Sequence, residues 1–242
     1  MKEFLYNIKK EFLYLFTYPT NQLKIFSVDY DAYWEDKRGE HLGKLSRWQR
    51  QRADLVFSYL NKQHNPVSLS DVGCGDGSVL AYLKEKGGVS RIVGVDVSSS
   101  ALVKARAQGV ETILIGKELQ EGIAVVPETD YVLLLEVLEH MPDAEQFLKA
   151  MLDKSKKGVF FSFPNTGYVL HRLRLLMGRF PLQWRIHPSE HLRFWTYADL
   201  KWWLKALGYT QYSIHTYEGV PVLNRVWPSL FGRGLFVYLP KD

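Results

Sequence analysis

The sequence is poor in cysteine and has no long apolar run. Among 242 residues there is one cysteine, Cys74, which excludes a disulfide within the chain and favours a reducing compartment. The run that comes nearest to a membrane span is Tyr131–Leu138. It is shorter than the roughly 20 residues that cross a bilayer, and Glu136 interrupts it. Charged residues are spread through the N-terminal segment, unlike a signal peptide. We therefore expect a cytoplasmic protein.

Acidic residues are outnumbered, and the excess positive charge is concentrated in one segment. The chain has 31 Lys and Arg against 26 Asp and Glu, a net charge of +5. Residues 171–195 contain +4 of this charge, because one acid, Glu190, stands against Arg172, Arg174, Arg179, Arg185 and Arg193. The hydrophobic fraction of 46% excludes intrinsic disorder, and the length suits one α/β domain with some decoration.

The first part of the chain differs from the rest. Apolar residues recur at helical spacing over residues 1–17, which predicts an amphipathic helix. The following residues, up to about Gly43, are aromatic and irregular, and another helix is expected over Leu45–Asn61. We predict an N-terminal helical extension or lid at residues 1–45 and a single domain at residues 46–242.

From Val67 onward, short β-rich runs alternate with helical stretches. This alternation predicts right-handed βαβ units and a doubly wound, mainly parallel sheet. After a helix at Tyr197–Leu207, β-rich runs at Tyr209–Thr216 and Gly234–Leu239 predict a late antiparallel pair. The earlier strands are expected near Ser68–Val72, Arg91–Val95, Thr112–Ile115, Tyr131–Leu135 and Val159–Phe163, with helices near Ser78–Lys86, Ser99–Gln108 and Pro142–Lys154.

A glycine-rich turn follows the first of these strands. In Asp71-Val-Gly-Cys-Gly-Asp-Gly-Ser78 the glycines permit a tight turn and let backbone touch a ligand over the strand ends. The second strand ends in Asp96, whose carboxylate can accept both hydroxyls of a ribose. Dinucleotide-binding proteins carry G-x-G-x-x-G, which would need glycine or alanine where Ser78 stands. The pattern therefore predicts an adenosine-bearing ligand without a pyrophosphate.

These residues resemble the motifs of class I S-adenosylmethionine-dependent methyltransferases. Asp71–Gly77 with Asp96 is similar to their first two motifs, and Asp130–Met141 is similar to their fourth-strand motif. The sequence most resembles the methionine-biosynthesis W-type and ubiquinone-type branches (methyltransferase types 11 and 12). The resemblance implies a Rossmann-like, seven-stranded sheet with an antiparallel last strand, and S-adenosyl-L-methionine as the cofactor.

The resemblance also implies which residues meet the cofactor. The family often has a Gly-Asp pair after the third strand, where Gly116 is here followed by Lys117 and Glu118, so Glu118 is displaced by one residue. Val97 would form an apolar wall against the ring. The full set of expected cofactor-binding residues is Asp71, Gly73, Cys74, Gly75, Asp76, Gly77, Asp96, Val97, Glu118 and Glu136.

Two histidines are candidates for chemistry. His140 ends the fourth-strand motif, where the family architecture faces the methyl donor, so it could act as a base or position the acceptor. Alternatively it simply begins the next helix. His191 lies in the loop beyond strand five, which covers the acceptor site in this fold, or it is a solvated loop residue. Glu136, Glu139 and His140 could form a metal site, but residues on one strand end rarely converge on an ion, and we predict no metal.

The basic segment 171–195 has three interpretations. It could hold an anionic acceptor, lie on a membrane surface through its interleaved leucines and aromatics, or be the solvated face of a lid helix. Its position beyond strand five favours an anionic small-molecule acceptor. Nucleic acid is not expected, because Phe163-Pro164-Asn165 stands where base-methylating relatives carry Asn/Asp-Pro-Pro-Tyr.

We thus predict a methyltransferase (EC 2.1.1.-) that acts on a small molecule. A protein of another class is the main rival: the W-type relatives are associated with homoserine O-acyltransferase, so the chain could work as a weakly catalytic or non-catalytic partner. A nicotinamide-dependent reductase is a weaker alternative, against which Gly77-Ser78 argues. The atom that accepts the methyl group and the oligomeric state are not predicted.

Overall fold

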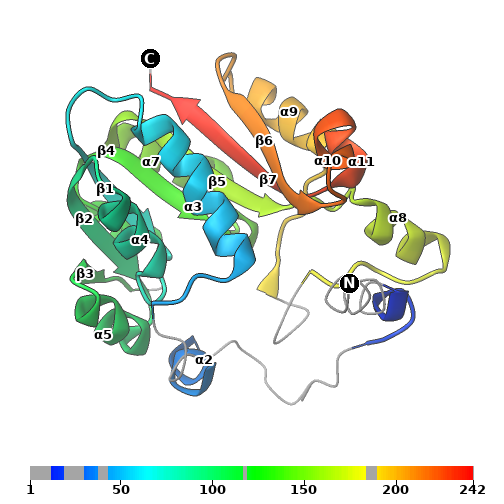
Figure 1. Ribbon diagram of the computed structural model, residues 1–242, viewed down its shortest axis with the longest axis horizontal. Coiled ribbons are helices and arrows are strands. Elements are labelled where there is room, and N and C mark those ends of the chain that lie inside the picture. The colour runs from blue at the N-terminus through cyan, green and yellow to red at the C-terminus, as the bar shows by residue number, and fades with distance from the viewer. Residues whose placement is uncertain (1–11, 19–29, 38–42, 117–118, 184–189, 242) are drawn as a thin grey trace.

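A computed structural model describes residues 12–18, 30–37, 43–116, 119–183 and 190–241. Its centre is a seven-stranded sheet in the order β3-β2-β1-β4-β5-β7-β6 (Figure 1). The strands are β1 (Val67–Val72), β2 (Val89–Asp96), β3 (Glu111–Leu114), β4 (Thr129–Leu135), β5 (Ser155–Pro164), β6 (Ser213–Gly219) and β7 (Gly232–Pro240). Strands β1 to β5 are mutually parallel, and β7 runs antiparallel between β5 and β6.

Helices cover both faces of this sheet. The helices of the described residues are α2 (Tyr30–Lys37), α3 (Arg47–Leu60), α4 (Ser78–Lys86), α5 (Ser99–Ala107), α6 (Leu119–Val125), the 3₁₀ helix η1 (Leu138–His140), α7 (Ala144–Lys154), α8 (Val169–Leu176), α9 (Tyr197–Ala206), α10 (Leu223–Val226) and α11 (Pro228–Phe231). Capping boxes begin α3 at Ser46 and α9 at Thr196, which satisfies backbone N–H groups that a helix start leaves open.

Two apolar cores result, one on each face of the sheet. Buried residues of α3, α4 and α5 pack on one face, and buried residues of α7 and α9 pack on the other. The strands are apolar on both faces, as a sheet covered on both sides requires, and Phe160 and Phe161 on β5 point into opposite cores. The predicted doubly wound sheet and its antiparallel late strands are therefore confirmed.

The strand order fixes where a ligand can bind. β1 lies between β2 and β4, so the connections leave β1 and β4 in opposite directions along the sheet. In open α/β sheets this switch point leaves a crevice outside the carboxyl ends of the strands. The glycine turn follows β1, Asp96 ends β2, and η1 follows β4, so all three lie at this edge.

The N-terminal part differs from the sequence expectation. Residues 30–37, expected to be irregular, form helix α2, which contacts α5 (Figure 1). Of the amphipathic helix expected over residues 1–17, the first eleven residues lie outside the described part, and residues 12–14 are helical. No helix in the described ranges is long and apolar enough to cross a bilayer. The division at residue 45 stays a prediction.

Candidate active site

The glycine turn has the backbone geometry that its sequence predicts. Gly73, Gly75 and Gly77 all have positive φ, between 55° and 78°, a region that other residues rarely adopt. The Gly73 N–H donates to the carbonyl of Val95 at 2.7 Å, which ties the turn to β2. Gly77 then serves as the N-cap of α4. The turn therefore presents bare backbone at the carboxyl edge of the sheet.

Asp96 stands beside this turn, at the end of β2. Its carboxylate accepts the Gly75 N–H at 2.8 Å and the Ser98 N–H at 2.9 Å. Burial raises the pKa of Asp96, while these backbone donors lower it. Each carboxylate oxygen can accept more than one hydrogen bond, so the side chain is fixed in place and can still receive hydroxyl donors.

The other expected cofactor residues lie near the turn with less specific roles. Cys74 is buried, and burial raises the pKa of its thiol well above the usual value, so it fills space rather than acts as a nucleophile. Asp76 is also buried and accepts the Ser78 N–H at 3.2 Å. Val97 is partly exposed at the sheet edge. Glu118 lies outside the described residues. Their contacts with a cofactor stay predictions.

Beneath the turn lies a buried cluster of charges that the sequence did not predict. Arg52 of α3 pairs with Glu136 at 3.0 Å, and its charge lowers the pKa of Asp71 on β1. Burial has the larger effect on Asp71 and raises its pKa to about 8. A signal for Arg52 exists in the sequence, because it falls on the apolar stripe of its helix with Trp48, Val56 and Leu60.

Glu136 is held in a strained backbone position at the end of β4. Its φ of 63° is unusual for a residue with a side chain. Its Oε1 accepts the hydroxyl of Tyr217 at 2.6 Å and that of Ser162 at 3.0 Å, besides the bond from Arg52. The sequence placed Glu136 among the cofactor residues, and the structure shows that it also links β4, β5, β6 and α3.

Several buried polar atoms in this region have no hydrogen-bond partner among the described residues. They include the Nε of Arg52, the Oδ1 of Asp71 and both carboxylate oxygens of Glu139. Buried polar groups in proteins are nearly always hydrogen-bonded, so an unmatched donor and acceptors at one sheet edge indicate a polar ligand. A guanidinium donor and carboxyl oxygens in the same place suit an amino acid, which carries both an accepting carboxylate and a donating ammonium group. The region therefore fits the methionine half of the implied cofactor.

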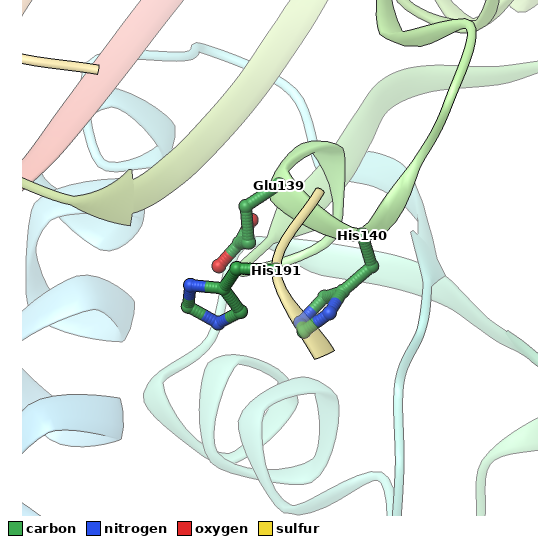
Figure 2. Close-up of side chains that lie close together, drawn as sticks. All are labelled: Glu139, His140 and His191. Atoms are coloured by element: carbon green, nitrogen blue, oxygen red, sulfur yellow. The ribbon is translucent and has the colours of Figure 1, made fainter. Parts of the chain in front are cut away.

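Glu139, His140 and His191 meet at the same edge (Figure 2). Glu139 and His140 lie on η1, and His191 precedes α9, so residues about 50 positions apart converge. The backbone explains how: the N–H of Leu192 donates to the Glu139 carbonyl at 2.8 Å. One ligand atom from each of the three side chains lies within 4.8 Å of the other two.

The protonation states of this cluster follow from its contacts. The Nδ1 of His140 lies 2.5 Å from the carbonyl oxygen of Glu190, which can only accept, so Nδ1 carries a proton. In the neutral ring the lone pair is then on Nε2. Burial, and secondly His140, lower the pKa of His191 to about 4, so this ring is neutral at pH 7. Burial and Glu136 raise the pKa of Glu139 well above the usual value.

The cluster also has the composition of a divalent-metal site. Two imidazoles and a carboxyl group with both oxygens unpartnered among the described residues are ligands that divalent transition metals accept. The ligand set differs from the one considered from sequence, because His191 takes the place of Glu136. A bound cation would favour the ionised form of Glu139 and so remove the cost of burying it.

Helix α2 covers the glycine turn. The ring of Trp34 lies against Gly75, where any side chain on residue 75 would collide with it. Asp31 accepts hydrogen bonds from the Ser98 hydroxyl at 2.7 Å and the Ser100 N–H at 3.0 Å, at the start of α5. Burial, together with Glu190, Asp96 and Glu139, raises the pKa of Tyr30. Tyr30 is therefore close enough to these acids to feel their charge.

The charge of the basic segment 171–195 suggested an anionic acceptor, but its described arginines make contacts within the chain. Arg193 pairs with Glu145 at 2.7 Å, Arg174 is buried and donates to backbone carbonyls, and the Nε of Arg172 donates to the carbonyl of Gly167. Arg179 donates to the carbonyl of Phe16, and Arg185 lies outside the described residues. Each of the four described arginines therefore has a partner within the chain, and for Arg193 this partner is an acid.

Comparison with known proteins gives a consistent family. A model described as a methyltransferase domain matches residues 40–214. The ubiquinone biosynthesis O-methyltransferase of Hydrogenovibrio crunogenus is 29% identical over 150 residues, covering 59% of this chain and 60% of that protein. The bifunctional methionine biosynthesis protein MetXA/MetW of Rhodopirellula baltica is 28% identical over 151 residues, covering 55% of this chain and 23% of that protein.

A solved structure agrees with this assignment at the level of the fold. The magnesium protoporphyrin IX methyltransferase of Synechocystis, solved with bound S-adenosylhomocysteine (SAH), has a TM-score of 0.52 and 19% identity over 96% of this chain and 94% of that one. The chain spans less than two thirds of the curated relatives described above. With the matched domain covering most of the chain, this protein belongs to the class I S-adenosylmethionine-dependent methyltransferases.

Proposed function

We propose that this protein transfers the methyl group of S-adenosylmethionine to a small-molecule acceptor. The observation that carries the proposal is the convergence at one sheet edge of a bare glycine turn, the fixed carboxylate of Asp96 and the Glu139–His140–His191 cluster. The first two suit the adenosine end of the cofactor. The third supplies groups that can accept a proton close by.

Different residues of the site bind different parts of the cofactor. Asp96 accepts the ribose hydroxyls, and the glycine turn lets the cofactor lie directly on backbone. The unmatched Nε of Arg52 meets the carboxylate of the methionine half, and the Oδ1 of Asp71 meets its ammonium group. These charged contacts orient the cofactor and keep it in place, which supplies much of the acceleration in a displacement of this kind.

The cofactor supplies an electrophilic methyl group on a sulfonium. The chain's contribution to the step is to align the acceptor and to take its proton. With Nδ1 donating to Glu190, His140 presents the Nε2 lone pair and accepts the proton of an acceptor O–H or N–H. General-base help of this kind adds about 10²–10⁴-fold to a rate. His191 is neutral and packs edge-on against His140, with ring centroids 4.8 Å apart, which fixes the ring.

The unpartnered oxygens of Glu139 favour a second form of this activity. A divalent cation held by Glu139, His140 and His191 would act as a Lewis acid and lower the pKa of a bound acceptor hydroxyl. The two forms differ in one measurement. Methyl transfer that a chelator abolishes and added Mg²⁺, Mn²⁺ or Zn²⁺ restores requires the cation, whereas transfer that is unaffected by chelation leaves His140 as the base.

An anionic acceptor is the finer part of the proposal. Its support is the charge of residues 171–195 and their place after β5, beside the histidine cluster. The contacts of the described arginines reduce this support. The names of two similar proteins, a ubiquinone O-methyltransferase and a magnesium protoporphyrin methyltransferase, favour a small organic acceptor. A cytoplasmic location is likewise retained as a prediction.

Calorimetric titration with SAH tests the proposal. We expect the wild type to bind and Asp96→Ala to bind at least about tenfold more weakly, since hydrogen bonds to a charged group contribute about 1.5–3 kcal/mol. Glu111→Gln is the matched control, because Glu111 is an exposed acid on the neighbouring strand β3. Absence of SAH binding, or equal affinities for wild type and Asp96→Ala, would contradict the proposal.

A partner-binding role is the second candidate. It rests on the similarity to the MetXA/MetW protein, of which this chain matches 23%. In this role the protein would bind a biosynthetic acyltransferase. Co-purification of such an enzyme with both the wild type and Asp96→Ala, together with no methyl transfer to a panel of hydroxyl and amine acceptors, would favour association over catalysis.

A further inference from the structure

An exposed apolar surface lies away from the site, on α8 and residues 12–18. We call it the α8 face. Leu176 is 82% exposed, Phe12 61% and Phe180 57%. Single exposed apolar side chains are ordinary on protein surfaces, whereas a contiguous group indicates an interaction site. The members are Phe12, Leu13, Phe16, Tyr18, Leu173, Leu175, Leu176, Met177 and Phe180.

The two segments of the α8 face are joined by specific contacts. Arg174 is buried and donates to the carbonyls of Tyr14, Thr17 and Phe180. The hydroxyl of Tyr14 lies 2.6 Å from the Nδ1 of His171 and accepts the N–H of Leu182 at 3.1 Å. Residues 12–18 are thus fastened to the inner side of α8, and the apolar side chains stay outside.

Within the two described segments that form the α8 face, the charged side chains have one sign. The sequence has no aspartate or glutamate from Asn165 to Ser189, nor from Phe12 to Tyr18. Arg172 is exposed beside the leucines, and the guanidinium of Arg179 lies over the rings of Phe16 and Tyr18. Apolar side chains interleaved with arginines and aromatics are the composition of segments that lie in the interface of an anionic bilayer.

The shape of the α8 face also suits a lipid surface. Figure 1 shows α8 projecting at the edge of the molecule, away from the central sheet. A projecting short helix fits a deformable surface into which side chains can sink. We propose that the α8 face docks on an anionic lipid surface, with the leucines and phenylalanines in the acyl region and the arginines among the headgroups.

The α8 face is connected along the chain to the histidine cluster. Four residues separate the end of β5 from the start of α8, and the chain beyond α8 leads to His191. Asn165, just after β5, forms an isolated bridge with Trp195, which holds the two ends of this excursion together. The α8 face and His191 thus belong to one excursion of the chain, although the face itself is separate from the site.

Flotation of the full chain with lipid vesicles tests the inference. We expect binding to vesicles in which about one third of the lipid is phosphatidylglycerol, and weaker binding to pure phosphatidylcholine, because the headgroup attraction is electrostatic. Replacing Leu175 and Leu176 with serine should weaken vesicle binding about tenfold or more, since two side chains lose their burial in the acyl region.

The matched control is Trp202→Ser, which removes an exposed aromatic on α9, outside the α8 face. This variant should bind vesicles like the wild type. The melting temperature and SAH affinity of the leucine variant should be unchanged, which separates loss of docking from loss of fold or of cofactor binding. Equal binding to neutral and anionic vesicles, or no binding, would overturn the inference. A dimer that the leucine variant dissociates would assign the α8 face to a second copy instead.

Discussion

At the scale of single residues, the site depends on charges that are buried together. Asp96 was predictable from sequence, because a carboxylate at the end of the second strand has a position fixed by the fold. The role of Arg52 was not predictable. Its place on an apolar stripe indicates only that it is buried, whereas its role depends on Asp71 and Glu136, which lie on other elements. His191 was a candidate, but its pairing with Glu139 needed the three-dimensional structure.

Arg52 gives a direct test of this buried cluster. Arg52→Met should weaken SAH binding by about tenfold or more, because a charge-assisted hydrogen bond of about 1.5–3 kcal/mol is lost. Arg50→Met is the matched control on the same helix, where Arg50 is exposed above the ring of Tyr82. Calorimetry measures both affinities, and equal losses for the two variants would show that Arg52 does not contact the ligand.

Asp71 makes the stability of the ligand-free protein depend on pH. Its pKa is about 8 in the folded state, raised chiefly by burial and also by Asp96, against about 3.9 when unfolded. The folded state therefore holds a proton that the unfolded state releases, and Asp71 lowers stability as pH rises from about 4 to about 8. Below about pH 4 both states are protonated and the effect vanishes.

Asp71→Asn should remove this dependence, because an amide of the same shape does not titrate. We expect the variant to gain stability relative to the wild type by up to about 1.4 kcal/mol per pH unit across about pH 5–8. Urea unfolding at several pH values measures the difference. A difference that is constant with pH would mean that Asp71 is ionised in the folded protein.

At the scale of elements, the apolar periodicity of the sequence predicted the strands and helices that pack in the two cores. The strands and the helices α4, α5, α7 and α9 were predicted, because each buries a face whose pattern is visible in the sequence. Helix α2 was not, since Tyr30–Lys37 lacks an apolar stripe and is instead held by polar contacts to α5. Such contacts join residues nearly 70 positions apart and leave no local pattern.

Helix α2 should respond to the cofactor. It covers the glycine turn through Trp34, so bound SAH should slow hydrogen exchange across residues 30–37. Asp31→Ala removes the acceptor at the start of α5 and should abolish this protection, because α2 then loses its contacts with the Ser98 hydroxyl and the Ser100 N–H. Glu35→Gln keeps an acceptor for the Ser100 hydroxyl and is the control. Protection that survives in Asp31→Ala would separate α2 from the cofactor site.

At the scale of the whole molecule, the two apolar cores and the site have different sources of stability. The cores are complete without a ligand, because the sheet is covered on both faces. The site is incomplete, because the orphaned atoms of Arg52, Asp71 and Glu139 are buried without partners among the described residues. A ligand that supplies these partners binds only the folded protein and must therefore raise its melting temperature.

The size of this rise can be stated in advance. SAH at about 100 times its dissociation constant should stabilise the fold by about 2.7 kcal/mol, which corresponds to about 5–10 °C for a domain of this length. Replacing Leu175 and Leu176 on the α8 face should leave the rise intact, because that face is separate from the site. Asp96→Ala at the same SAH concentration should lose most of it. Differential scanning calorimetry distinguishes the cases, and an equal rise in wild type and Asp96→Ala would place the ligand away from the glycine turn.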